Sequence, residues 1–522
     1  MKVKHIIIAL AAALSVGLAS CDDKLDIPKH GNMGGQDDFY KTDEQAMQAA
    51  ASLYSSWSGN YYDWFFLKNL ISDDAWTGGG SRGDNADYER LNEYTFDTVH
   101  GSIKTTYKNL YAIIYNANLI IEKVEPDTPV KKRVLAEAYF FRAWAHFELV
   151  TLWGTAPVVD HLLANGEYHQ PNSTPEALWA IVESDLTTAI EMSALPSKAD
   201  VNDKETTIRI TLEAAQAMLG KAYLFQGKDA DAAKMLDKVI DSKKYDLYRG
   251  ELDMLHHAAA NSCCESILEA QKRNDPEQTW TQFTMTYLMM GWRTALLNVG
   301  DLSQSFALGT YGFLNPKKDL YDAFVATEGV DGYRLKSTIR TYEQLNKEYN
   351  LSQKSGERLV GHEGVFNWKN RALKEDCIMD AEYFQGFQYI NLRVMRYAEV
   401  LLLAAEAHIK GGSAAKAVEY VNIIRERARL TPLGSVTLED IKNEKRLELC
   451  FEAVRFQDLV RWGDAEKVLG QQGKQIPAFV DGKVVPAAFT NATFGFKPKH
   501  KLLPIPRVEL ELNSNMTQNE NW

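Results

Sequence analysis

The sequence predicts a mainly α-helical fold in which helical hairpins form a scaffold for long irregular loops and a minor amount of β structure. Three observations predict it: long segments with apolar residues at helical spacing, two segments that share a hairpin pattern, and three segments without helical periodicity. Hydrophobic residues make up 45% of the 522 residues and charged residues 25%, so the composition is that of an ordinary globular protein.

Two segments of the N-terminal half predict long helices. Residues 134–153 place Leu135, Phe141 and Leu149 on one helical face, and Gly154 follows as a stop signal. Residues 175–192 form the second, because Thr174 is a suitable N-cap and Pro175 suits the first turn.

Two further segments resemble tetratricopeptide repeats. Residues 211–241 place small residues, including Gly220, where two antiparallel helices cross, and Gly227 lies at the turn. Residues 395–429 repeat this pattern, with Gly411 and Gly412 at the turn. We therefore expect a tetratricopeptide-like scaffold of stacked hairpins over about residues 36–272 and 385–522.

The segments without helical periodicity are 73–95, 274–316 and 470–498. The first is polar and rich in Gly, the second is rich in Trp, Tyr and Met, and the third suggests a small β-hairpin. Long irregular segments in a compact protein usually carry function. We expect a variable ligand-loop region over about residues 273–384, joined by the loop 73–95.

The N-terminus predicts export and lipid attachment. A basic start and a short apolar run precede Leu18-Ala-Ser-Cys21, so residues 1–20 are a lipoprotein signal peptide and Cys21 is the lipid-attachment residue. Asp22 and Asp23 resemble an acidic tag that directs lipoproteins to the outer face of the outer membrane.

Charge and cysteine content exclude several classes of protein. The net charge is −12, which argues against nucleic acid and against electrostatic binding to anionic lipid. Four cysteines beyond Cys21 do not make a disulfide scaffold, and Cys450 is expected to be buried in a helix. The adjacent pairs His256-His257 and Cys263-Cys264 lack zinc-site spacing, so we expect no metal and no cofactor.

Four motifs resemble the SusD/RagB family of outer-membrane nutrient-binding lipoproteins of Bacteroidetes. They begin at Phe141, Arg396, Asn443 and Lys501, reading FRAWAHFEL, RYAEVLLLAAEA, NEKRLELCFEAVRFQDLVRWG and KLLPIP, the last followed by Thr517-Gln-Asn519. The resemblance runs from the lipid-attachment motif to the end of the chain.

The resemblance implies one SusD-like domain over residues 21–522 on the cell exterior, anchored in the outer membrane by its lipid. It also implies a SusC-like, TonB-dependent barrel as partner, to which the protein delivers a captured glycan. It implies a binding protein and no enzyme.

The charged motif residues are expected to be structural. They recur three or four positions apart on predicted helices, a spacing that favours ion pairs on one face. They are Glu444, Arg446, Glu448, Glu452, Arg455, Asp458 and Arg461.

Ligand-binding candidates come from the two long loops, because sugars are bound by aromatic rings and by planar polar groups. The loop 73–95 supplies Asp73, Trp76, Arg82, Asn85 and Tyr88, and residues 274–316 supply Trp280, Tyr287, Trp292, Arg293, Tyr311 and Phe313. Gly78 to Gly80 are expected to let a backbone approach closely. Trp76 is the strongest single candidate, because its neighbours in the sequence are too small and too polar to bury it.

Three alternative functions fit the same sequence. The first is a peptide-binding RagB-like lipoprotein of the same kind of transporter complex. The second is a surface glycosidase, which needs two carboxyl groups across a cleft. The third is a lid whose aromatic residues contact only the barrel.

Overall fold

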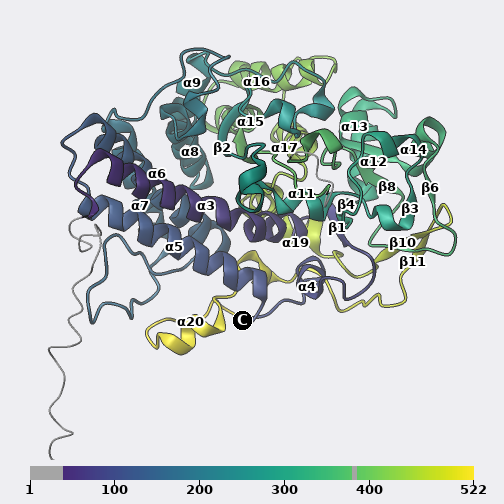
Figure 1. The fold of residues 1–522 in the computed structure, drawn as a ribbon, viewed down its shortest axis with the longest axis horizontal. Coiled ribbons are helices and arrows are strands. Elements are labelled where there is room, and N and C mark those ends of the chain that lie inside the picture. Colours follow the sequence, from purple (N-terminus) through teal and green to yellow (C-terminus); the bar gives the residue numbers. More distant parts are fainter. Residues whose placement is uncertain (1–38, 379–384) are drawn as a thin grey trace, which may run out of the picture.

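The structure is a computed structural model that describes residues 39–378 and 385–522. The predicted signal peptide and Cys21 lie outside these residues, as do Asp22 and Asp23. The protein is 53% helix and 9% strand, so the prediction of a mainly helical fold with minor β structure is confirmed. The long helices gather at one end of the molecule and most of the strands at the other, while β2 (Ser266–Ala270) lies between them (Figure 1).

Four long helices build the N-terminal part: α3 (Asp43–Leu70), α5 (Gly101–Lys123), α6 (Pro129–Trp153) and α7 (Pro175–Glu191). The hydroxyls of Thr42, Thr128 and Thr174 accept hydrogen bonds from amides in the first turns of α3, α6 and α7. Helices α6 and α7 confirm the two predicted helices, and α6 begins five residues earlier than predicted because Pro129 suits the first turn.

The two predicted hairpins are present. They are α8 (Leu212–Phe225) with α9 (Asp229–Asp241), and α15 (Tyr397–Gly411) with α16 (Ala414–Arg427). Helix α9 packs against α15, so the hairpins stack (Figure 1). A Cβ added to Gly220 would lie 2.6 Å from Cγ of Leu236, which explains why a glycine occupies this crossing.

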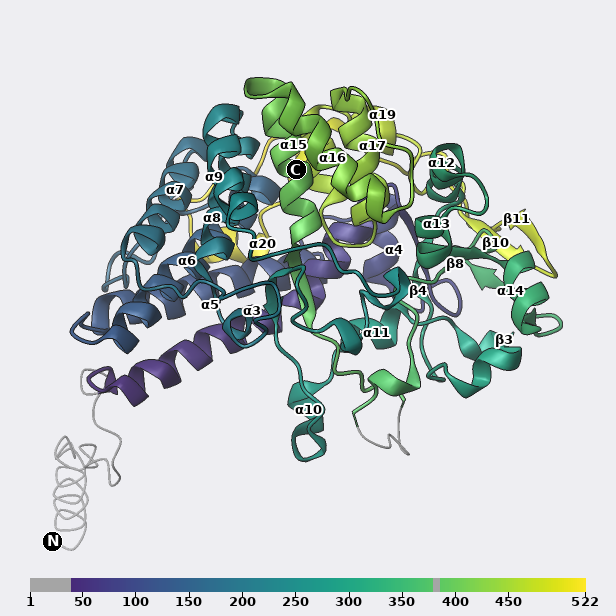
Figure 2. The ribbon, with the colours of Figure 1, turned by 90° about the horizontal axis from the view of Figure 1, so that it is seen from above.

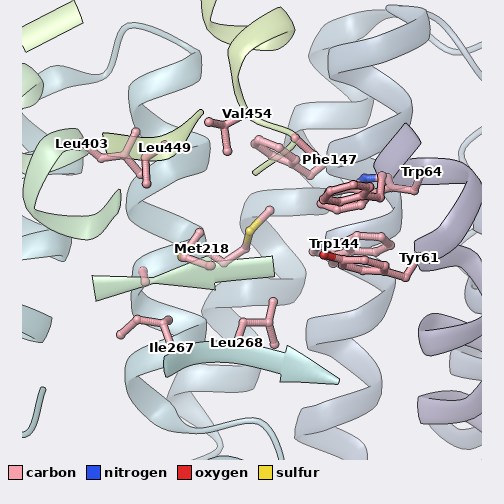
Figure 3. Packing of buried hydrophobic residues seen from close by; sticks show 14 of the residues in the cluster. Tyr61, Trp64, Trp144, Phe147, Met218, Ile267, Leu268, Leu403, Leu449 and Val454 are labelled. Atoms are coloured by element: carbon pink, nitrogen blue, oxygen red, sulfur yellow. The ribbon is translucent and has the colours of Figure 1, made fainter. Parts of the chain in front are cut away.

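The main hydrophobic core surrounds α6, which is buried on most of its circumference. The rings of Trp64 on α3 and Trp144 on α6 have centroids 6.0 Å apart, and Tyr61 packs against Trp64. Figure 3 shows these rings beside Phe147 and Met218, with Leu403 and Leu449 across the cluster. The core therefore joins the N-terminal helices to the C-terminal hairpin.

The remaining helices are shorter. They are α4 (Ala86–Glu93), α10 (Thr279–Gln282), α11 (Met285–Met290), α12 (Lys318–Glu328), α13 (Tyr333–Thr338), α14 (Tyr342–Tyr349), α17 (Leu438–Leu449), α18 (Arg455–Trp462), α19 (Ala465–Leu469) and α20 (Arg507–Leu512). Figure 2 shows α11, α13 and α14 on the side of the molecule opposite α7.

The strands form small sheets. The antiparallel pairs are β1 (Ala75–Gly78) with β4 (Phe313–Pro316), β2 (Ser266–Ala270) with β9 (Leu392–Arg396), β3 (Leu297–Asn298) with β6 (Ser352–Gln353), and β5 (Ile339–Thr341) with β8 (Val365–Asn367). A three-stranded sheet has the order β11 (Lys483–Pro486), β10 (Pro477–Val480), β7 (Leu359–Val360). Strands β10 and β11 confirm the predicted hairpin in residues 470–498.

The charged motif residues form a buried ion-pair network, as predicted. Arg396 donates to Glu448 and Glu452, and Arg334 lies 2.6 Å from Glu444. Arg461 donates to both oxygens of Glu406 at 2.6 Å. Because each of these charges is desolvated, removal of one partner leaves an uncompensated charge, so the network is structural.

The end of α6, just after the motif that begins at Phe141, contacts the motif that begins at Lys501 and the residues that follow it. The indole of Trp153 donates to the carbonyl of Pro504 at 3.0 Å. The amide of Asn519 donates to the carbonyls of Trp153 and Leu503, both at 2.8 Å. The C-terminal residues therefore close the end of α6.

Cys263, Cys264, Cys377 and Cys450 are free thiols, and Cys450 is buried as predicted. In the described part of the chain, each helix is too short or too polar to cross a membrane.

Candidate functional site

The two predicted ligand loops are joined by a β-ladder. Strand β1 in the first loop pairs with β4 in the second, and Trp76 lies opposite Asn315 while Gly78 lies opposite Phe313 (Figure 1). The amide of Gly79 extends the ladder by donating to the carbonyl of Gly312 at 2.8 Å. Segments more than 200 positions apart are thus held together by a buried ladder.

The glycines of the first loop permit this junction. Gly78 has a φ of 76°, and a Cβ there would lie 2.3 Å from the carbonyl oxygen of Gly312. A Cβ on Gly80 would lie 2.6 Å from the guanidinium of Arg293. The predicted close approach exists, and its partners are strand β4 and an arginine of the second loop.

We call the exposed part of this junction the joined-loop surface and define it by Gly80–Asp84, Arg293 and Tyr311. Asp84 accepts a hydrogen bond from the Gly80 amide at 2.7 Å and lies 3.6 Å from Nη1 of Arg293. The Arg293 guanidinium lies 5.8 Å from the centroid of the Tyr311 ring. A carboxylate, a planar guanidinium and a phenol ring therefore face solvent together, which suits sugar hydroxyls and a sugar face.

Arg82 lies at the edge of this surface. Its guanidinium pairs with Glu93 and with Glu89 and lies 4.8 Å from the ring of Phe489. The hydrogen bond from Arg82 to Glu93 raises the pKa of the arginine further, while burial raises the pKa of Glu89. About a third of the Arg82 side chain is exposed, and each of its guanidinium nitrogens is paired with Glu93 or Glu89.

Trp76 is buried, and the expectation that it is poorly covered is wrong. Its side chain is 6% exposed, its indole donates to Glu363 at 2.8 Å, and the ammonium of Lys317 lies 4.3 Å from its ring. Ile476 and Ala487 complete the cluster around it. The covering residues are distant in the sequence, so its small and polar neighbours gave the wrong indication.

The other candidates of the first loop support the fold. Asn85 caps α4 by accepting from the Tyr88 amide at 3.1 Å, and Tyr88 stacks on Phe66 with centroids 4.7 Å apart. Residues 86–93 are therefore helical and were wrongly assigned to an irregular segment. Asp73 accepts two hydrogen bonds from Arg455 at 2.8 and 2.9 Å.

The charge of Asp73 is held by its arginine partners. Burial acts to raise its pKa, but Arg455 and Arg446 outweigh burial and hold the pKa well below its usual range. The residue is 7% exposed. It is thus a permanently ionised anchor between the first loop and the C-terminal helices.

The aromatic candidates of the second loop differ in exposure. Trp292 lies in a second core cluster and donates to the carbonyl of Asn367 at 2.9 Å, and the Tyr287 hydroxyl donates to the carbonyl of His256 at 3.0 Å. Phe313 is buried in β4. Trp280 on α10 is 78% exposed, and Tyr311 is half-buried.

Sequence reasoning missed Asp84, Glu363 and Phe489. Only Asp84 could have been found from the sequence. It follows directly on the Gly-rich segment, and a charged residue beside glycines in a loop is accessible. Glu363 and Phe489 reach the site from distant segments. No group of three His, Cys, Asp or Glu side chains within residues 39–378 and 385–522 is arranged to hold a metal ion.

These features define a helical-hairpin scaffold protein that presents a polar and aromatic loop surface. The comparisons with known proteins agree with this class. The model of the SusD family matches residues 380–522, and a second model, described as "starch-binding associating with outer membrane", matches residues 37–224. The chain belongs to the SusD/RagB family.

Relatives cover almost the whole chain. SusD-like protein P2 of Formosa agariphila is 26% identical over 97% of both chains. The solved structure of a laminarin-binding SusD-like protein is 27% identical, with a TM-score of 0.77 over 92% of this chain and 100% of that one. Surface glycan-binding protein A of Bacteroides fluxus is 23% identical, with a TM-score of 0.75 and the same coverage, and shares the fold.

Proposed function

We propose that the protein is a cell-surface lipoprotein that captures an oligosaccharide or polysaccharide and delivers it to a SusC-like, TonB-dependent transporter. The observation that carries this proposal is the junction of two distant loops that exposes Arg293, Asp84 and Tyr311 together. It is supported by the family membership and by the 27% identical relative described as laminarin-binding.

In this proposal the protein binds and releases its ligand without breaking a bond. Tyr311 covers one face of a sugar ring, while Arg293 and Asp84 bind its hydroxyls as donor and acceptor. Residues 1–20 are removed on export, Cys21 carries the lipid, and residues 21–522 act as one domain on the outer face of the outer membrane.

The test uses the soluble form that begins after Cys21, with calorimetry and affinity gels against plant, host and fungal glycans. We expect binding to one class, with affinity at least tenfold weaker in Tyr311→Ala and in Arg293→Met. Arg293→Lys keeps the positive charge and loses the planar guanidinium, so its affinity for the glycan is expected to stay low. Tyr115→Ala is the matched control, because Tyr115 is 54% exposed on α5, away from the loops.

Other outcomes support the alternatives. Binding of peptides alone supports a RagB-like protein, and release of reducing ends supports a glycosidase. Loss of complex formation with the barrel in Tyr311→Ala, at unchanged sugar affinity, supports a purely structural lid.

A further inference from the structure

A groove of about 830 Å³ lies between α3 and α10, apart from the joined-loop surface. Small residues of α3, among them Ala51, Ser55 and Gly59, line one side, and the opposite side is formed by residues after β2 and by α10. Figure 2 shows α10 projecting from the face along which α3 runs. The volume is in the range of ligand-binding clefts.

The groove differs from the rest of the molecule in its charge. The protein has a net charge of −12, yet none of the residues lining the groove is Asp or Glu. The charged residues that line it are Arg209 and Lys272. The Arg209 guanidinium is paired with the buried carboxylate of Glu137, so its charge is already balanced.

Lys272 has no such partner among residues 39–378 and 385–522. Its ammonium donates to the carbonyl of Thr281 at 3.1 Å, and no carboxylate oxygen of the described residues lies within 4.0 Å of it. Burial lowers the pKa of Lys272, and no acid among the described residues opposes this effect. A half-buried cation without an anion gains free energy from an anionic ligand, because such a ligand replaces lost hydration.

Neutral polar groups surround this ammonium. Gln278 is the N-cap residue of α10 and Gln282 is its last residue, and both line the groove together with Thr281. No side-chain hydrogen bond to a described residue occupies the amides of Gln278 and Gln282. Primary amides offer paired donors and acceptors that match the hydroxyls of a sugar.

We propose that this groove binds an acidic sugar chain, in which Lys272 holds a carboxylate or sulfate ester and the amides of Gln278 and Gln282 bind the neighbouring hydroxyls. The proposal rests on the proposed function, since it assumes a saccharide ligand, and it adds a site and a charge preference to it. Trp280 is separate, because it contacts Phe283 and Phe387 and does not line the groove.

The experiment measures binding of two anionic probes to the soluble form that begins after Cys21. One probe is a hexagalacturonate, compared with its methyl ester; the other is a sulfated galactan hexasaccharide, compared with its desulfated form. We expect one anionic probe to bind, its neutral partner to bind at least tenfold more weakly, and Lys272→Gln to remove this difference. Added NaCl is expected to weaken binding of the anionic probe to the wild type more than binding to the variant.

Lys354→Gln is the matched control. Lys354 is exposed, also donates to a backbone carbonyl (that of Ala295, at 2.8 Å), and lies outside the groove. The variant removes the same charge and is expected to bind like the wild type. An equal loss in both variants would mean that net charge alone controls binding, and it would overturn the assignment to the groove.

Two further results overturn the proposal: neither anionic probe binds, or Lys272→Gln binds the anionic probe like the wild type. The proposed function is tested separately through Tyr311. Neutral glycan binding that depends on Tyr311, together with anionic-probe binding that is unchanged in Lys272→Gln, contradicts the groove alone. A Lys272 effect without a Tyr311 effect contradicts the joined-loop site alone.

Discussion

Asp73 and Arg455 form a two-point ion pair across 382 positions of sequence, with oxygen–nitrogen distances of 2.8 and 2.9 Å. Arg446 lies 3.0 Å from the same carboxylate. Both arginines come from helices that carry the family motif, and Asp73 begins the first ligand loop. The pair thus fixes the joined-loop surface to the C-terminal helices.

Asp73→Asn is therefore expected to destabilise the fold by about 3 kcal/mol, because it leaves the mostly buried guanidinium of Arg455 without its counterion, while Arg446 keeps only its second partner, Asp74. The measurement is the free energy of unfolding in urea. Affinity for glycan is expected to stay unchanged in the folded variant. Asp322→Asn is the control: Asp322 pairs with Lys318 at 2.5 Å on the surface, and its loss changes stability by less than about 0.5 kcal/mol. If a fully stable Asp73→Asn variant bound glycan more weakly than the wild type, Asp73 would be assigned to the binding site.

The helical scaffold was predictable because its signals are local. The residues around Gly220 follow the spacing of a helical hairpin. Two adjacent residues, Thr174 and Pro175, mark the start of a helix. Such features depend on neighbours three or four positions away. The structure confirms both.

The composition of the site was less predictable because burial depends on distant segments. Trp76 and Trp280 both lie in polar stretches of sequence, yet one is 6% and the other 78% exposed. Lys317, Glu363 and Ile476 cover Trp76 from 240 to 400 positions away. Nothing in the local pattern separates the two tryptophans.

Trp292 and Trp280 provide a second prediction, since they belong to the same loop and differ in burial. Trp292→Ala is expected to lower the free energy of unfolding by about 3–5 kcal/mol, because it empties the second core cluster beside Phe306 and Phe366. Trp280→Ala is expected to change it by less than about 0.5 kcal/mol. Urea unfolding of both variants makes the comparison, and equal losses would contradict the assigned burial.

Gly220 tests the close crossing of α8 and α9. Gly220→Ala is expected to destabilise the protein by about 1–2 kcal/mol, because the new methyl group would overlap the Leu236 side chain and force the helices apart. Gly59→Ala is the matched control, since Gly59 is also in the interior of a helix and no atom lies within 4 Å of its added Cβ. There the substitution is expected to stabilise by about 0.5–1 kcal/mol. Thermal unfolding of both variants measures the sign of each change in stability. A stabilising effect of Gly220→Ala would contradict the close crossing of α8 and α9.

His362 makes stability depend on pH. Burial lowers the pKa of His362 to about 3, and the ring is fixed by a hydrogen bond from the Gly364 amide at 3.0 Å and by Phe366. In the unfolded chain the pKa of histidine is about 6.5, so the unfolded state binds the proton first. Its contribution is fully present above pH 6.5 and is lost as the pH falls towards 3, by about 1.4 kcal/mol per pH unit.

His362→Asn keeps a hydrogen-bond acceptor and removes the titration. Between pH 7 and pH 5 the wild type is expected to lose about 2 kcal/mol more stability than this variant. Urea unfolding at the two pH values measures the difference. Burial also lowers the pKa of His146, to about 4, so the variant keeps part of the slope. His161→Asn is the control, because His161 is on the surface and its hydrogen bond to Asp160 raises its pKa, so its variant is expected to retain the loss between pH 7 and pH 5. If His362→Asn lost as much stability as the wild type, the imidazole would bind its proton over the same pH range in the folded and unfolded protein, and the burial of this ring would not control its protonation.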